Sequence, residues 1–148
     1  MVTRRVVLLC GPPGSGKTTA AHASGLEVYD RDDPRWRNDE AQFRKAIARL
    51  ATNPDARAVV IRSGATQSAR LKAAEAIDAT HVYMLAAPVD ELARRVAKRG
   101  RADARNGLAS IQRWIDRHDL AGVAMFPGWD NTTEPTRRTR YDEATWVW

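Results

Sequence analysis

The stretch GPPGSGKT, residues 11 to 18, decides the fold that this sequence predicts. It matches the pattern G-x-x-x-x-G-K-[ST] in full, and the apolar run from Val6 to Cys10 comes directly before it. A helix-compatible stretch follows, so the context is the strand, loop and helix of a phosphate-binding loop. Gly14 and Gly16 permit backbone angles that turn successive N–H groups toward an anion. The stretch therefore predicts a nucleotide-binding site.

Individual residues of this loop have distinct expected roles in binding ATP or another nucleoside triphosphate. Lys17 can reach the β- and γ-phosphates, so we expect it to act in catalysis as well as in binding. The Thr18 hydroxyl is expected to be a ligand of Mg²⁺. The residues of the loop expected to bind ATP are Gly11, Pro12, Pro13, Gly14, Ser15, Gly16, Lys17, Thr18 and Thr19.

Strand-like and helix-like segments alternate along the chain. Short apolar runs at residues 6–10, 26–29, 56–64 and 81–85 are separated by segments with apolar residues at helical spacing. This alternation predicts an α/β fold of the P-loop NTPase, kinase type, with three layers (α/β/α) and a mainly parallel four-stranded sheet. We expect residues 1–121 to form one kinase-type domain.

The segment after this domain breaks the alternation. Residues 122–148 carry aromatic side chains among Pro, Gly, Thr and Arg. The aromatic residues are Phe126, Trp129, Tyr141, Trp146 and Trp148. So aromatic a tail is expected to pack on the domain or on a partner chain, which would provide a route to a homo-oligomer.

The composition limits the partners and the location. The net charge of +6 suggests a polyanionic partner, although a codon-usage bias toward arginine explains it equally well. No apolar run approaches the ~20 residues of a membrane helix, so no membrane partner is expected. The single cysteine, Cys10, is expected to be a packing residue in a reducing compartment, which favours the cytoplasm.

The segment YDRDDPRWR, residues 29–37, follows the second predicted strand and lies at the carboxyl edge of the sheet, where the phosphate loop also opens. A carboxylate there can orient an acceptor hydroxyl and take its proton, and an arginine can bind a phosphate of the acceptor. A solvated turn with local ion pairs is the alternative. Because the third strand ends in Arg62-Ser63-Gly64 without a carboxylate, an acid from residues 30–33 is the remaining protein candidate to assist Mg²⁺.

Three segments resemble the kinase domain of the bacteriophage polynucleotide kinase/phosphatase family: GPPGSGKTT at 11–19, RDDPR at 31–35 and ELARRVAKRG at 91–100. The resemblance extends from residue 5 to about residue 120. It implies transfer of the γ-phosphoryl group of ATP to the 5′-hydroxyl of a DNA or RNA end, with Mg²⁺ as cofactor. The phosphatase half of the larger family members has no counterpart in this chain.

The resemblance also assigns roles to single residues. It implies that Asp32 is the general base for the acceptor hydroxyl and that Arg35 binds the 3′-phosphate of the acceptor. Arg99, in an arginine-bearing helical lid, would bind the donor phosphates and act in catalysis, with Arg95 as a second ATP-binding residue. The family has an Asp-Thr pair near the acceptor where this chain has Ser63-Gly64, and Ser63 can still donate a hydrogen bond to a phosphate.

The lid region is strongly basic. Between Leu92 and Arg117 eight basic residues stand against two acidic ones, as a cationic flap over a phosphoryl-transfer site requires. A solvated helix face is the alternative, and we prefer it for Arg94 and Arg113. Gly100 and Gly107 are expected to bracket a short connection before the last helix, so this segment is not expected to be helical.

The leading hypothesis is therefore an ATP-dependent polynucleotide 5′-kinase. Within kinases, the alternative is transfer to a small acceptor such as a nucleoside, a sugar or an antibiotic. Outside kinases, the alternative is a slow NTPase that binds nucleic acid through its basic face.

Overall fold

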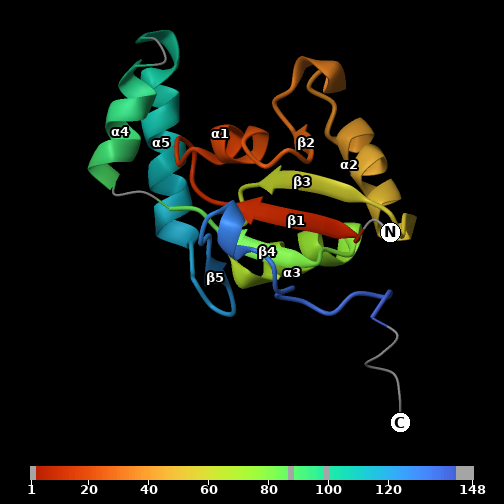
Figure 1. The fold of residues 1–148 in the computed structure, drawn as a ribbon. Coiled ribbons are helices and arrows are strands. Elements are labelled where there is room, and N and C mark those ends of the chain that lie inside the picture. Colours follow the sequence, from red (N-terminus) through yellow and green to blue (C-terminus); the bar gives the residue numbers. More distant parts are fainter. Residues whose placement is uncertain (1–2, 87–88, 99–100, 143–148) are drawn as a thin grey trace.

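The middle layer of the molecule is a sheet in which five strands of the described residues run parallel in the order β2-β3-β1-β4-β5 (Figure 1). The computed structural model describes residues 3–86, 89–98 and 101–142. The strands are β1 Arg5–Cys10, β2 Glu27–Asp30, β3 Arg57–Arg62, β4 His81–Met84 and β5 Ala124–Met125. The central strand β1 is buried from Val6 onward, as expected for a parallel strand covered on both faces.

Helices cover both faces of this sheet. They are α1 Lys17–His22, α2 Glu40–Ala48, α3 Gln67–Ile77, α4 Val89–Lys98 and α5 Arg101–Arg117, with short 3₁₀ helices at Pro34–Trp36, Arg49–Thr52 and Trp129–Asn131. Asp39 and Thr66 cap α2 and α3, because their side chains accept hydrogen bonds from the backbone N–H groups of Gln42 and Ala69. In Figure 1, α1 lies on one face, α3 lies on the other, and α4 and α5 form a pair beyond the carboxyl end of β1.

The alternation of side chains along β1 builds two separate cores. Val7 and Leu9 pack on the α1 side, with Ala21 of that helix. Val6 and Leu8 pack on the opposite side, in the cluster that the apolar side chains of α2 and α3 complete. The two helical layers around one sheet confirm the predicted three-layer α/β/α architecture of a P-loop kinase.

Two details of the prediction were wrong. The sheet has a fifth strand, because Ala124 and Met125 pair with Tyr83 and Met84 of β4. A strand of two residues has no periodic pattern of its own, and it forms here through pairing with the exposed edge of β4. The connection expected over residues 100–107 is helical from Arg101, since the alanine-rich residues around Gly107 favour a helix strongly enough to include that glycine.

Residues that follow β5 pack on the α1 side of the sheet. Phe126 contacts Tyr83 edge to face at 5.8 Å between ring centroids, and the indole of Trp129 donates a hydrogen bond of 2.8 Å to the carbonyl oxygen of Ala20. Trp146 and Trp148 lie outside the described residues, so their packing stays a prediction.

None of the described helices is both long and apolar enough to cross a lipid bilayer.

His81, at the start of β4, is expected to make the stability depend on pH. Its side chain is 3% exposed, and Nδ1 lies 2.7 Å from the hydroxyl of Thr80. Burial, aided by the charge of Arg5, lowers the pKa of His81 below its usual 6.5. Between these two pKa values the unfolded chain binds a proton that the folded chain does not, so the free energy of unfolding falls as the pH drops below 6.5.

Urea unfolding at a series of pH values tests this expectation. The variant His81→Asn keeps a polar partner for Thr80 but does not titrate, so its stability should change less over the same pH range. An identical pH dependence in the variant and the wild type would assign the effect to other groups.

Candidate active site

The loop between β1 and α1 forms one wall of a cavity of about 450 Å³ at the carboxyl edge of the sheet. Gly14 and Gly16 have φ angles of 80° and 94°, in the left-handed region that glycine adopts without strain. The cavity is lined by Pro13, Gly14, Ser15, Gly16, Lys17, Thr18, Thr19, Asp30, Arg31, Asp32, Glu40, Ile61, Arg62 and Ser63. Of the nine loop residues expected to bind ATP, the last seven thus border one space.

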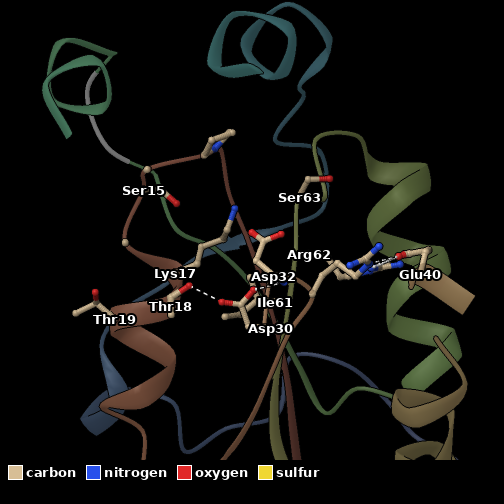
Figure 2. A pocket seen from close by; sticks show the side chains of 14 residues that line it. Ser15, Lys17, Thr18, Thr19, Asp30, Asp32, Glu40, Ile61, Arg62 and Ser63 are labelled. Atoms are coloured by element: carbon tan, nitrogen blue, oxygen red, sulfur yellow. Dashed lines mark hydrogen bonds and ion pairs between the residues drawn. The ribbon is translucent and has the colours of Figure 1, made fainter. Parts of the chain in front are cut away.

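Lys17, the first residue of α1, turns back over the phosphate loop. Its ammonium group donates hydrogen bonds to the carbonyl oxygens of Gly11 and Pro12, the two loop residues that do not line the cavity. Figure 2 shows its side chain extending into the space between Ser15 and Asp32. A cation at this place can bind the β- and γ-phosphates of a nucleotide seated on the loop.

Thr18 and Asp30 form a pair on the floor of the cavity (Figure 2). The Thr18 hydroxyl donates a hydrogen bond of 2.8 Å to Oδ2 of Asp30, and Oδ1 of Asp30 accepts a hydrogen bond of 3.0 Å from the backbone N–H of Asp32. These hard oxygen donors fit Mg²⁺, which commonly uses few protein ligands together with phosphates and water. Residues 3–86, 89–98 and 101–142 hold no group of three or more His, Cys, Asp or Glu side chains arranged to bind a metal.

Asp32 lies in the same cavity, and its carboxylate accepts no hydrogen bond from the described residues. The bond from its own N–H to Asp30 fixes the turn that carries it. An exposed carboxylate without a protein donor is free to accept a hydrogen bond from a hydroxyl group. The predicted general base therefore lies beside Lys17 and the Thr18–Asp30 pair.

Glu40, the first residue of α2, links three arginines on the other side of the cavity. Its carboxylate lies 3.0 Å from Arg31, 2.8 Å from Arg62 and 3.3 Å from Arg44. Burial by itself would raise the pKa of Glu40, but the hydrogen bonds and charges of these arginines outweigh it and lower that pKa below its ordinary value. Glu40 is therefore ionised at neutral pH and holds the arginines in place.

The three residues expected to contact the acceptor do not all lie in the cavity. Asp32 and Ser63 line the cavity, whereas Arg35 is not among its lining residues. The guanidinium of Arg35 donates a hydrogen bond of 2.7 Å to the carbonyl oxygen of Val28 and lies over the ring of Trp36, 4.5 Å from its centroid. Arg35 thus contacts strand β2 through Val28 and the ring of Trp36, the last residue of the 3₁₀ helix Pro34–Trp36.

The two lid arginines also differ. Arg95 of α4 donates a hydrogen bond of 2.8 Å to the carbonyl oxygen of Gly14 and pairs with Glu91 one turn earlier. It therefore lies directly on the phosphate loop. Arg99 lies outside the described residues, and its expected catalytic role stays a prediction.

Sequence reasoning did not assign Glu40 and Arg62 to the site, and it included Asp30 only as one of the acids of residues 30–33 that could assist Mg²⁺. The spacing of Asp30 and Asp32, two residues apart after a strand, was a signal that both carboxylates reach the same edge. The link between Glu40 and Arg62 had no such signal, because they are 22 residues apart in the sequence and meet only when α2 packs on β3.

Comparisons with known proteins agree with this architecture. No protein-family model matches the chain, and no curated protein has a significantly similar sequence. Among solved structures, a sugar kinase from Janibacter sp. HTCC2649 has a TM-score of 0.56 at 19% identity, covering 83% of this chain and 80% of that one. A gluconokinase from Sinorhizobium meliloti 1021 has a TM-score of 0.54 at 19% identity, covering 84% and 83%.

A shikimate kinase from Acinetobacter baumannii, in complex with shikimate, is similar at a TM-score of 0.50 and 20% identity, covering 77% of this chain and 75% of that one. At such identities the likeness shows the fold and leaves the reaction and the substrate to be argued from the site itself. The chain has the α/β fold of the P-loop kinases.

Proposed function

We propose that this protein is an ATP-dependent kinase that transfers the γ-phosphoryl group to a hydroxyl group of a small molecule. The observation that carries the proposal is the meeting of Lys17, the Thr18–Asp30 pair and Asp32 in one cavity. A nucleotide-binding module needs the first two of these features. The free carboxylate of Asp32 beside them is what a transfer to a hydroxyl group requires in addition.

In an in-line transfer, the residues around this cavity would have different roles. The loop N–H groups and Lys17 would bind the β- and γ-phosphates, and Arg95 would add positive charge from α4. Thr18 and Asp30 would hold Mg²⁺, which neutralises charge on the transferred phosphate when it is bound. Asp32 would accept the proton of the acceptor hydroxyl as that oxygen bonds to the γ-phosphorus and the bond to the β-phosphate oxygen breaks.

Two observations favour a small acceptor over a polynucleotide. Arg35, which the family resemblance assigns to the 3′-phosphate of a nucleic acid, does not line the cavity and already binds the carbonyl oxygen of Val28. The structural neighbours are named as kinases of sugars, gluconate and shikimate, which are small acceptors. Transfer to a 5′-hydroxyl end is therefore the second candidate, supported by the resemblance of the sequence motifs.

An assay with ATP labelled in the γ-phosphate and with Mg²⁺ distinguishes these functions. The acceptors are a set of polyols and hydroxy acids, a nucleoside, an oligonucleotide with a 5′-hydroxyl end, and no acceptor as the blank. We expect label on a small molecule and none with Lys17→Met. Label on the oligonucleotide alone would establish the second candidate, and label released only as free phosphate would refute a kinase of either kind.

A further inference from the structure

Arg62, the last residue of β3, lies where the parts of the candidate active site meet. In the sheet it pairs with Cys10, which precedes the phosphate loop, and its neighbour Ile61 pairs with Asp30. Ile61 packs in the core on the α1 side, so Arg62 projects to the opposite side, over the ring of Phe43 on α2. From there it lines the cavity that also holds Asp32.

The guanidinium of Arg62 is held firmly but only partly used. Nη1 lies 2.8 Å from Glu40, and the guanidinium carbon lies 5.2 Å from the centre of the Phe43 ring. The side chain is 21% exposed. Nε and Nη2 donate no hydrogen bond to any of the described residues. Arg62 therefore presents a positioned pair of N–H donors without a protein acceptor.

The surrounding charges leave room for an added anion. Arg31, Arg44 and Arg62 share the single carboxylate of Glu40, so this cluster carries an excess of positive charge. Arg31 also donates to the carbonyl oxygen of Asn38 at 2.9 Å, and the Arg44 side chain is 69% exposed. Arg62 is the member of the cluster that combines low exposure with unused donors.

A second cavity offers space for the body of an acceptor. It measures about 630 Å³, lies between α2 and α3, and shares Glu40, Arg62 and Ser63 with the phosphate cavity. Short side chains, among them Ala69 and Ala73 of α3, form part of its wall. An acceptor can therefore extend past Arg62 with its hydroxyl group still beside Asp32.

We propose that Arg62 selects the acceptor, and that the acceptor is a small hydroxylated molecule with an oxyanion, either a carboxylate or a phosphate. Nε and Nη2 of Arg62 bind the two oxygens of that anion as a fork, while Glu40 and Phe43 fix the guanidinium. Arg62 thereby disfavours neutral sugars and polyols, because they leave its donors unpaired. This inference rests on the proposed kinase function and names the substrate class for it.

Binding is measured by calorimetry on protein saturated with Mg²⁺ and a non-hydrolysable ATP analogue. The nucleotide occupies the phosphate loop, so anions that bind in addition report on another site. The probes are gluconate and glycerol 3-phosphate, each compared with its neutral counterpart, sorbitol and glycerol. Tighter binding of gluconate would indicate a carboxylate site, and tighter binding of glycerol 3-phosphate would indicate a phosphate site.

Arg62→Met should weaken binding of the preferred anion by about 10- to 100-fold, since a charge-assisted fork is lost. Arg62→Lys keeps the positive charge but cannot form the two parallel hydrogen bonds, so it should recover only part of the affinity for the anion. Arg57→Met is the matched control, because Arg57 lies at the opposite end of β3 and bonds the carbonyl oxygen of Thr3 at 2.7 Å. Affinity for the ATP analogue should be the same in all variants.

Anionic probes that bind no better than neutral ones, or equally well to Arg62→Met, would overturn the proposal. The labelled-ATP assay, run with the same four compounds, tests the kinase function separately. Anion binding that depends on Arg62 without transfer to any acceptor would refute the kinase function and leave the anion site established. Transfer that is equally efficient to anionic and neutral acceptors would refute the role of Arg62 and leave the kinase function standing.

Discussion

Replacing Asp32 by Asn should lower the rate of phosphoryl transfer by about 10²–10⁴-fold, the usual contribution of a general base. The asparagine keeps the size of the side chain and can still accept a hydrogen bond from the acceptor, but it cannot take the proton. The backbone bond from residue 32 to Asp30 does not involve the side chain, so the turn should persist. Affinity for ATP should therefore change little while kcat falls.

Asp33→Asn is the matched control for this experiment. Asp33 is the next residue and carries the same charge, but it does not line the cavity and its side chain instead accepts a hydrogen bond from the backbone N–H of Arg35 at 2.9 Å. Asparagine caps a helix about as well as aspartate, so this variant should fold and react normally. A variant Asp32→Asn that keeps the kcat of the wild type would remove Asp32 from the role of base.

Replacing Arg70 by Met should cost about 1–3 kcal/mol of unfolding free energy, because the buried carbonyl oxygens of Gly64 and Ala65 lose their hydrogen-bond donor. The Arg70 side chain is 3% exposed. It donates to the carbonyl oxygens of Gly64, Ala65, Asp119 and Ala121 and to the carboxylate of Asp119, at 2.7 to 3.2 Å. It thereby ties the loop after β3 to the segment after α5.

Urea unfolding followed by tryptophan fluorescence measures this loss. Arg113→Met on α5 is the control: the Arg113 guanidinium donates to the hydroxyl of Ser110 on the exposed side of its helix, and its loss should change stability by less than about 0.5 kcal/mol. Equal stability of Arg70→Met and Arg113→Met would show that the network around Arg70 contributes nothing net.

The same network gives the Arg70 variant a pH signature. The hydrogen bond from Arg70 lowers the pKa of Asp119 below its ordinary 3.8. A lowered pKa in the folded state adds stability above pH 3.8 that is lost as the pH falls through the folded value. In Arg70→Met this part of the acid dependence should become weaker.

For the acidic segment after β2, the sequence predicted the position of the segment but not the contacts of its individual side chains. Its place at the carboxyl edge of the sheet was predicted from the strand before it, and Asp30 and Asp32 do line the cavity. The sequence did not show which of the charged side chains in this segment bind within the protein and which face the cavity. Arg35 bonds the carbonyl oxygen of Val28, and Arg31 joins Glu40, because the 3₁₀ turn that Asp33 caps decides where each side chain points.

The sequence by itself determined the phosphate loop, the alternation of strands and helices, and hence the three-layer fold. These features depend on backbone angles and side-chain periodicities within a few residues, which a sequence displays directly. Tertiary structure alone decided the pairing of β5 with β4 and the meeting of Glu40 with Arg62. Such contacts depend on strand register and helix packing between distant segments, and the acceptor preference that we propose for Arg62 depends on the contact with Glu40.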